Sequence, residues 1–240
     1  MLITGGASGI GAAMVTAFAE QGARVAFLDV ADAAAEALCE GLGEAPHPPL
    51  YIRCDLTDIA ALQTAVERVG RELGDVGVLV NNAARDDRQE LDDVAPGDWR
   101  ASMAVNLDHL FFAAQAVRPH MQRRGGGSIV NFASVAGMGG ALRMVSYSTA
   151  KAAIIGLTKS LAKEFGPDNI RVNAIAPGAV MTERQLKLWF TEESAAAIAD
   201  RQLIRRRLLP EDIASTALFL ASDDAAMITK QCLVVDAGLT

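Results

Sequence analysis

Short apolar runs alternate along this chain with longer segments in which apolar residues recur at helical spacing. Seven runs, bounded by Gly, Pro or Asp, predict strands: Leu2–Thr4, Arg24–Asp29, Leu50–Cys54, Val78–Asn81, Ser128–Phe132, Ile170–Ile175 and Gln231–Val235. Segments between them predict helices: Ile10–Gln21, Ala33–Leu42, Ile59–Leu73, Pro96–Gln122, Tyr147–Phe165 and Glu211–Ala221. Strands that alternate with helices indicate βαβ units with right-handed crossovers.

The predicted fold is an α/β domain with a doubly wound parallel sheet that spans residues 1–240 as a single unit. Ligands of such sheets bind at the carboxyl ends of the strands. Only three residues precede Thr4. We therefore expect either a short first strand or a natural chain that starts upstream.

Composition narrows the function classes. The 240 residues are 51% hydrophobic, which favours a buried core over disorder. A net charge of −7 disfavours binding to nucleic acid. No apolar run reaches the ~18 residues of a membrane span, and no secretion signal opens the chain. We expect a cytoplasmic protein that contacts neither membrane nor nucleic acid.

Cysteines and histidines are too sparse to form a recognisable site. Cys39, Cys54 and Cys232 lie far apart, and no CxxC pair is present. They are expected to be reduced, buried thiols rather than disulfides or zinc ligands. The three histidines lack metal-ligand spacing, so no metal site is predicted.

A glycine-rich segment, Thr4–Gly11, joins the first strand to the first helix. Glycine permits positive φ and lets a pyrophosphate approach the backbone, while the helix N-terminus attracts the anion. An ordinary βα turn is the alternative. We expect cofactor contacts from Gly5, Ser8, Gly9, Ile10 and Gly11.

Asp29 ends the second strand, where a dinucleotide-binding fold places the carboxylate that accepts from the adenosine ribose. A carboxylate there repels a 2′-phosphate, so we predict NAD rather than NADP. The alternative is a solvated strand-end aspartate. Asp55 and Leu56, at the third strand's end, are candidate neighbours of the adenine, although Asp55 could instead cap a helix.

Several motifs occur in the order that is typical of one family. They are the TGxxxGxG loop, Asn81–Ala84 after the fourth strand, Ser134 after the fifth, Tyr147-x-x-x-Lys151, and Pro177-Gly178 after the sixth. In this the chain resembles a short-chain dehydrogenase/reductase over essentially its whole length. The resemblance implies a Rossmann fold and an enzyme that transfers a hydride between a CH–OH group and a nicotinamide cofactor.

The chemistry of the residues agrees with that resemblance. Tyr147 and Lys151 share one helix face, and a neighbouring ammonium lowers the pKa of a phenol, which is otherwise near 10. Tyr147 could then take a proton from a hydroxyl while hydride leaves the same carbon. Ser134 could orient the reacting oxygen. A packed tyrosine beside a solvated lysine is the alternative.

The family resemblance assigns further roles. Lys151 would hold the nicotinamide ribose, and Asn106 would stabilise a helix bend and hold a water of the proton relay, although it could simply be a polar helix residue. The same resemblance implies cofactor contacts from Asn82, Ala83, Ala84, Tyr147, Lys151, Pro177, Gly178, Val180 and Thr182. The family more often has Gly where Ala84 stands, and we expect the added methyl to be tolerated, with an altered cofactor fit as the alternative.

Two segments bear on the substrate. One is the charged run after Asn82, and the other is Thr182–Gln185 followed by Trp189. Both are similar to segments of bacterial aldose 1-dehydrogenases, which act on xylose, arabinose, fucose or rhamnose. Polar side chains and a Trp suit a polyhydroxylated ring. The candidate substrate residues are Asp86, Arg88, Gln185 and Trp189, with plain surface positions as the alternative. The predicted product is a lactone.

Other functions stay open at this point. The substrate could be a polyol, a steroid or a 3-oxoacyl thioester, and a dinucleotide-sensing regulator without catalysis is the alternative of another class. The resemblance implies a mobile lid near residues 181–209 and a homotetramer that pairs the long helices. Arg205–Arg207 are expected to form a solvated face rather than a phosphate site.

Overall fold

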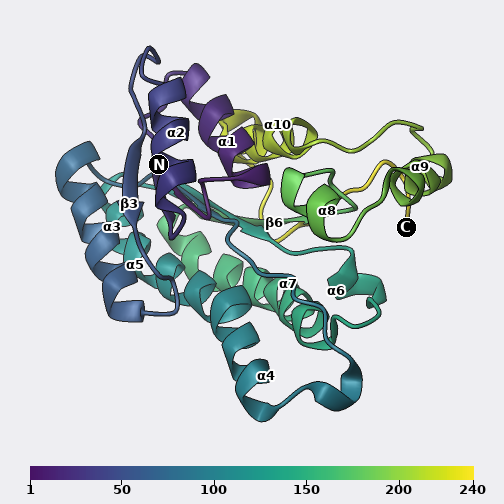
Figure 1. Cartoon of the computed structure of the whole chain (residues 1–240). Coiled ribbons are helices and arrows are strands. Elements are labelled where there is room, and N and C mark those ends of the chain that lie inside the picture. Colours follow the sequence, from purple (N-terminus) through teal and green to yellow (C-terminus); the bar gives the residue numbers. More distant parts are fainter.

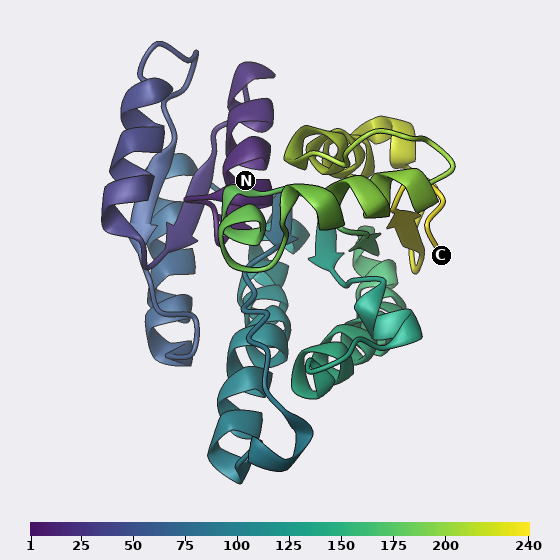
Figure 2. The ribbon, with the colours of Figure 1, turned by 45° about the vertical axis from the view of Figure 1, so that its right-hand side comes forward.

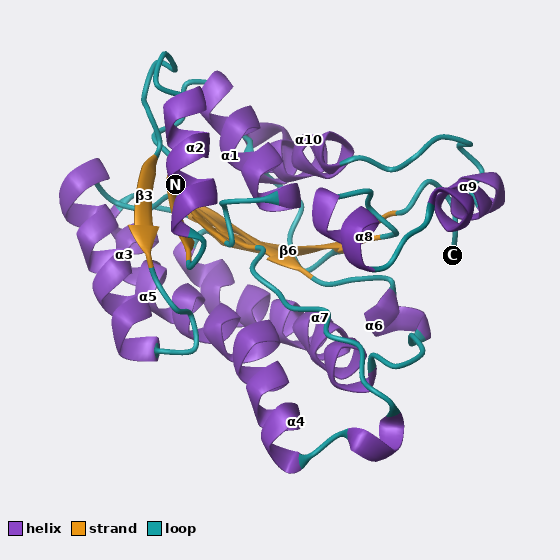
Figure 3. Cartoon of the chain, in the orientation of Figure 1, coloured by secondary structure: helices purple, strands orange, loops and turns teal.

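A computed structural model describes all residues from 1 to 240. A seven-stranded parallel sheet runs through the centre in the order β3-β2-β1-β4-β5-β6-β7 (Figures 1 and 3). Its strands are β1 (Leu2–Thr4), β2 (Ala26–Asp29), β3 (Leu50–Arg53), β4 (Val78–Asn81), β5 (Gly127–Phe132), β6 (Ile170–Pro177) and β7 (Cys232–Val235). All seven predicted strands are therefore present, and the doubly wound fold is confirmed.

The order reverses between β1 and β4, and this switch point places the ligand site. β1 is only three residues long, yet it pairs on both sides, with Thr4 opposite Leu28 of β2 and Asn81 of β4. The loops that follow β1 and β4 consequently leave the same edge of the sheet side by side.

Helices cover both faces of the sheet (Figure 3). They are α1 (Gly9–Glu20), α2 (Asp32–Gly41), α3 (Ile59–Leu73), α4 (Pro96–Met103), α5 (His109–Arg123), α6 (Ala136–Gly139), α7 (Val145–Phe165), α8 (Glu183–Leu188), α9 (Glu192–Arg201) and α10 (Pro210–Ala221). No helix is both long enough and apolar enough to cross a lipid bilayer.

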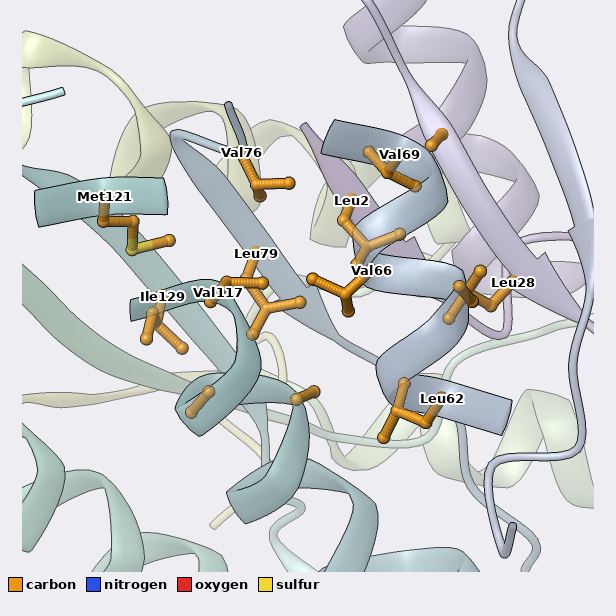
Figure 4. Close-up of a cluster of buried hydrophobic side chains, with 14 of the residues drawn as sticks. Leu2, Leu28, Leu62, Val66, Val69, Val76, Leu79, Val117, Met121 and Ile129 are labelled. Carbon is orange, nitrogen blue, oxygen red and sulfur yellow. The ribbon is translucent and has the colours of Figure 1, made fainter. Parts of the chain in front are cut away.

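Alternating strand residues feed two separate cores. Leu2 and Ile129 pack with α3, α5 and α7 on one face, whereas Ile3 and Val130 pack with α1 and α10 on the other. This is the period-two pattern of a sheet buried on both faces. Figure 4 shows the first core, in which Val66 of α3 lies among the strand leucines.

The long helical region predicted over Pro96–Gln122 is present, and the bend that the family resemblance implied at Asn106 lies within it. The segment divides into α4, a π-helical turn at Ala104–Asp108, and α5. The interruption has a specific cause, because the Asn106 side chain bonds to a distant backbone segment instead of pointing to solvent. The irregular helical composition of residues 181–209 corresponds to α8 and α9, whereas α6 has no counterpart among the predicted helices.

Candidate active site

A cleft of about 340 Å³ opens at the carboxyl edge of the sheet. It brings together predicted residues from both halves of the chain: Ile10, Asn82, Ala84, Asp86, Arg88, Ser134, Tyr147, Lys151, Pro177, Gly178, Val180, Thr182 and Gln185. Phe132, Met144, Phe190 and Leu239 also line it. Sequence reasoning missed these apolar residues, because nothing local distinguishes them from ordinary core positions.

The glycine loop packs tightly against the segment after β4. The Asn82 side-chain amide donates to the carbonyls of Gly5 (2.8 Å) and Thr4 (3.1 Å). In return, the Thr4 hydroxyl accepts from the backbone N–H groups of Asn82 and Ala83. Gly5 has φ +65°, and a Cβ there would lie 2.8 Å from Ala83 Cα. Asn82 therefore holds the glycine loop in place, and its predicted contact with the cofactor stays a prediction.

The same loop forms a cradle suited to a pyrophosphate. A Cβ on Gly11 would lie 1.8 Å from the Gly5 carbonyl oxygen, so the backbone can turn this closely only with glycine. The first helical N–H groups of α1 have no intrahelical partner, and the Ser8 side chain makes no capping bond to them. These donors and the helix dipole fit the diphosphate of a dinucleotide.

Asp29 lies at the end of β2 beside this cradle. Its Oδ2 accepts from the Ala7 backbone at 2.9 Å, and its Oδ1 accepts from Val30 and Ala31. The carboxylate therefore anchors the glycine loop as well as standing at the predicted ribose position. Arg53 lies opposite Asp29 in the sheet register, and it pairs with Asp32.

Two predicted adenine neighbours have local roles. Asp55 is exposed, and its Oδ1 accepts from both the backbone and the hydroxyl of Thr57. These bonds hold the pKa of Asp55 below its usual range. The cap of α3 is Asp58, which accepts from Ala61 at 3.0 Å, and not Asp55. Leu56 is buried in the first core.

Tyr147 and Lys151 lie one turn apart on α7. The Lys151 ammonium nitrogen is 5.5 Å from the centre of the Tyr147 ring and donates to the Phe132 carbonyl at 2.6 Å. Lys151 is 2% exposed, although it carries a titratable amine. Ser134, in the loop after β5, hydrogen-bonds Tyr147 and also accepts from the Ala136 backbone.

Burial dominates the protonation of this pair. Desolvation raises the pKa of Tyr147 to about 12, against a smaller lowering by the Ser134 hydrogen bond. Desolvation also lowers the pKa of Lys151 to about 7, opposed by the negative charge of Asp86. In the protein without cofactor, burial and the negative charge of Asp86 thus raise the pKa of Tyr147, and the predicted lowering by Lys151 stays a prediction.

Asn106 lies outside the main cleft. Its Oδ1 accepts from the Arg85 backbone at 2.8 Å, and its Nδ2 donates to the Arg85 carbonyl at 3.0 Å and to Ser102. It lines a separate polar cavity of about 160 Å³. The structure thus joins Asn106 to the bend in its helix and to the loop that carries Asp86.

His109 was not predicted as a site residue. It is fully buried directly after the π-helical turn, and its Nε2 lies 3.2 Å from the Ala83 carbonyl. Desolvation lowers its pKa to about 4, so the ring is neutral and can donate to that carbonyl. It therefore fixes the segment that faces the glycine loop.

The loop after β4 and the helix α8 meet across the cleft. Gln185 donates to Asp86 at 2.6 Å, and Arg184 donates to the other carboxylate oxygen of Asp86 at 3.2 Å. The Arg88 guanidinium lies 4.4 Å from the centre of the Trp189 ring. All four predicted substrate residues are consequently neighbours, although Trp189 does not itself line the cleft.

The segment after β6 closes the cofactor side of the cleft. Gly178 packs on Asp236, where a Cβ would come within 2.6 Å of the Asp236 side chain. Val180 bridges to Leu208, so the two ends of the segment 181–209 are held together. Thr182 caps α8 through Gln185 and lies against Gly9. In Figure 2 this segment, in green, runs between α10 above and α6 below.

The arginine run at the end of that segment is paired on the surface. Arg206 binds Asp212 and Arg207 binds Glu192, and both arginines are exposed or nearly so. This agrees with the solvated face expected for Arg205–Arg207.

Comparison with known proteins places the chain in a family. Residues 5–240 match a family model described as "Enoyl-(Acyl carrier protein) reductase". The chain is 55% identical, over its whole length and 94% of the relative's, to a "probable galactose dehydrogenase" of Rhizobium meliloti. It is 48% identical to a D-xylose 1-dehydrogenase of Caulobacter vibrioides, over 99% of this chain and 94% of the relative.

Solved structures show the same fold. A 3-oxoacyl-[acyl-carrier protein] reductase from Brucella melitensis with bound NAD superposes with a TM-score of 0.89 at 35% identity, over 99% of this chain and 89% of that one. A gluconate 5-dehydrogenase from Burkholderia cenocepacia, in complex with NADP and tartrate, superposes with a TM-score of 0.91 at 32% identity, over 99% and 93%.

This chain belongs to the short-chain dehydrogenase/reductase family. It is accordingly an oxidoreductase of CH–OH groups that uses a nicotinamide dinucleotide. Ser134, Tyr147 and Lys151 meet in the cleft of this oxidoreductase.

Proposed function

We propose that the protein is an NAD-dependent aldose dehydrogenase that oxidises the C1 hydroxyl of a monosaccharide to a lactone. One observation carries the proposal: Tyr147, Ser134 and Lys151 line the same cleft as the polar side chains Asp86, Arg88 and Gln185, which make part of its wall polar. Such a wall suits a ring that bears several hydroxyls. The names of the relatives, galactose dehydrogenase and D-xylose 1-dehydrogenase, support the same substrate class.

Tyr147 acts as the proton acceptor in this mechanism. Ser134 hydrogen-bonds the reacting hydroxyl and holds it toward the Tyr147 oxygen, which takes the proton as hydride leaves C1. The oxidised cofactor, when bound, supplies the hydride acceptor and a positive charge, and such a charge favours phenolate over phenol. Lys151, anchored on the Phe132 carbonyl, adds a donor beside the same site.

The cofactor we propose is NAD rather than NADP. Asp29 places a carboxylate beside the cradle that would repel a 2′-phosphate, and its hydrogen bond from Ala7 holds it there. The nearby cation Arg53 pairs with Asp32 and donates to the Val30 carbonyl, so much of its charge is offset. One solved relative holds NAD and another holds NADP, so membership of the family does not decide between the two cofactors. The negative charge of Asp29 is the feature that supports NAD.

Three further features are proposed with the function. The chain acts as one domain, and residues 181–209 form a substrate lid that is attached to the body near Val180 and Leu208. The protein assembles as a homotetramer through α4, α5 and α7, supported by the exposed Phe111 and Trp99. A cytoplasmic location fits its three free cysteines.

A substrate panel tests the proposed function. The purified protein is mixed with aldoses, polyols, a steroid alcohol and a 3-hydroxyacyl thioester, with NAD and then NADP, and the absorbance of the reduced cofactor is followed. We expect turnover with aldoses and NAD, and formation of the lactone. Activity confined to a non-sugar alcohol would contradict the substrate class, and faster turnover with NADP would contradict the role of Asp29.

A further inference from the structure

Asp86 is a poorly solvated carboxylate in the cleft. Its side chain is 14% exposed, whereas that of its neighbour Asp87 is 49% exposed. Asp86 lines the main cleft with Tyr147 and Ser134, while Asp87 lines the separate polar cavity, pairs with Arg85 and lies 3.9 Å from Arg184. Two adjacent aspartates thus face different spaces.

The hydrogen bonds that the Asp86 carboxylate accepts within the protein leave it able to accept a further one. Gln185 donates to Oδ2, and Arg184 donates to Oδ1. An ionised carboxylate has about four acceptor positions on its two oxygens. Because Arg184 donates through both Nε (3.4 Å) and Nη2 (3.2 Å), the carboxylate accepts three bonds in all, which leaves capacity for one hydroxyl donor, and the Gln185 amide beside it adds groups that can donate or accept.

The charge of Asp86 reaches the reacting groups. It raises the pKa of both Tyr147 and Lys151, which shows that its field extends across the cleft. Its partner Arg184 is half exposed, so solvent screens that cation more than it screens Asp86. Arg88 is the other cation of this wall, and its guanidinium lies on the Trp189 ring.

From this placement we propose that Asp86 is a specificity-determining residue, which accepts a hydrogen bond from a hydroxyl of a neutral sugar and excludes sugars that carry a carboxylate. The inference rests on the proposed function and refines its substrate class to neutral aldoses. A hydroxyl can donate to Asp86, but a carboxylate can only repel it. Exclusion by a mismatched buried charge is a recognised route to specificity.

The experiment compares an aldose with its uronic acid, which keeps the C1 hydroxyl and replaces the terminal CH₂OH by a carboxylate. Galactose and galacturonate form such a pair. For the unmodified enzyme we expect kcat/KM to favour the neutral sugar by about 100-fold or more. Asp86→Asn removes the charge at nearly constant shape and is expected to reduce this preference to below about tenfold.

The matched control is Asp87→Asn, which makes the same change on the same loop outside the cleft and is expected to keep the preference.

A pH profile adds a readout that a structural role would not move. Because Asp86 raises the pKa of Tyr147 and Lys151, its removal shifts the acid limb of kcat/KM to lower pH. Asp86→Ser serves as a second variant if Asp86→Asn does not fold.

The outcomes separate the two proposals. Equal turnover of aldose and uronate by the unmodified enzyme, or an unchanged preference in the Asp86 variants, would overturn the role of Asp86 and leave the aldose activity standing. If no aldose is oxidised with either cofactor, the proposed function itself fails.

Discussion

Tyr147 and Lys151 lie in an environment that opposes both of their charged forms. Burial keeps the phenol protonated and favours the neutral amine, with pKa values of about 12 and about 7. At neutral pH the phenol is therefore protonated, and the lysine, whose pKa lies near the pH of the solvent, is only partly charged. The sequence could place these two residues on one helix face, but it could not reveal how deeply the lysine is buried.

Burial of the Lys151 amine predicts that the stability of the folded protein depends on pH. Between pH values of about 7 and about 10 the unfolded chain keeps a proton on this lysine that the folded chain does not, so stability rises with pH. The measured quantity is the difference between two free energies of unfolding, that of the cofactor-free protein and that of its Lys151→Met variant. This difference should increase by about 1.4 kcal/mol per pH unit in this window. Urea unfolding across the window measures it.

Lys159→Met provides the control for that measurement, because Lys159 is an exposed lysine on the same helix. The difference between the unmodified protein and this variant should stay flat across the same pH range. A flat difference for Lys151→Met as well would show that its amine is solvated and charged in the folded protein.

The negative charge of Asp29 predicts that the enzyme prefers NAD to NADP. Asp29→Asn keeps an oxygen that can accept from Ala7 but removes the charge beside the ribose. The ratio of kcat/KM for NADP to that for NAD should rise by about tenfold or more, equivalent to about 1.4 kcal/mol. Glu36→Gln, an exposed carboxylate on α2, should leave the ratio unchanged. An unchanged ratio of kcat/KM values in Asp29→Asn would show that another group rejects the 2′-phosphate.

At the scale of elements, the bend between α4 and α5 links the helix to the site. Asn106 binds both backbone groups of Arg85, and Arg85 precedes Asp86 in the loop that lines the cleft. The π-helical turn exposes this side chain to the loop, and π-helical turns are frequent at functional sites. The bend therefore sets where the loop lies.

Asn106→Ala should reduce both stability and turnover. Two part-buried backbone groups of Arg85 lose their partners, which costs up to about 1–3 kcal/mol each where water does not replace the bond. Thermal unfolding and initial rates measure the two effects together. Ser102→Ala, which removes only the weaker bond to Asn106, should change both much less. An Asn106→Ala variant with unchanged stability and rate would contradict the link between bend and loop.

The elements differ in how well the sequence predicts them. Strand and helix alternation is local, so the strands and the long helices lie close to their predicted positions. The π-helical turn depends on a contact between Asn106 and Arg85, which are 21 residues apart. The contact of Asp86 with α8 spans 99 residues. Such pairings follow from topology, and a pattern along the chain does not contain them.

At the scale of the whole molecule, apolar side chains remain exposed on α4 and α5. Trp99 is 37% exposed and Phe111 is 41% exposed, and Phe111 packs edge-on against Phe112. Exposed aromatic residues of this size are typical of interfaces. The proposed homotetramer would cover them.

Phe111→Glu should therefore dissociate the assembly into smaller species without unfolding the subunit, because a buried, unpaired carboxylate in an interface is strongly unfavourable. Sedimentation velocity measures the assembly, and circular dichroism checks the fold. Leu142→Glu, at a 93% exposed loop position, should leave the assembly intact. A monomeric unmodified protein would refute the tetramer.

The measurement that tests the central claim most directly follows the hydride. An aldose that carries deuterium at C1 is oxidised with NAD, and the reduced cofactor is analysed by mass spectrometry, with Tyr147→Phe and Tyr51→Phe as comparison variants. We predict that the deuterium appears in the reduced cofactor, that Tyr147→Phe loses activity by about 10²-fold or more, and that Tyr51→Phe does not. Unlabelled reduced cofactor, or full activity in Tyr147→Phe, would contradict the proposed chemistry.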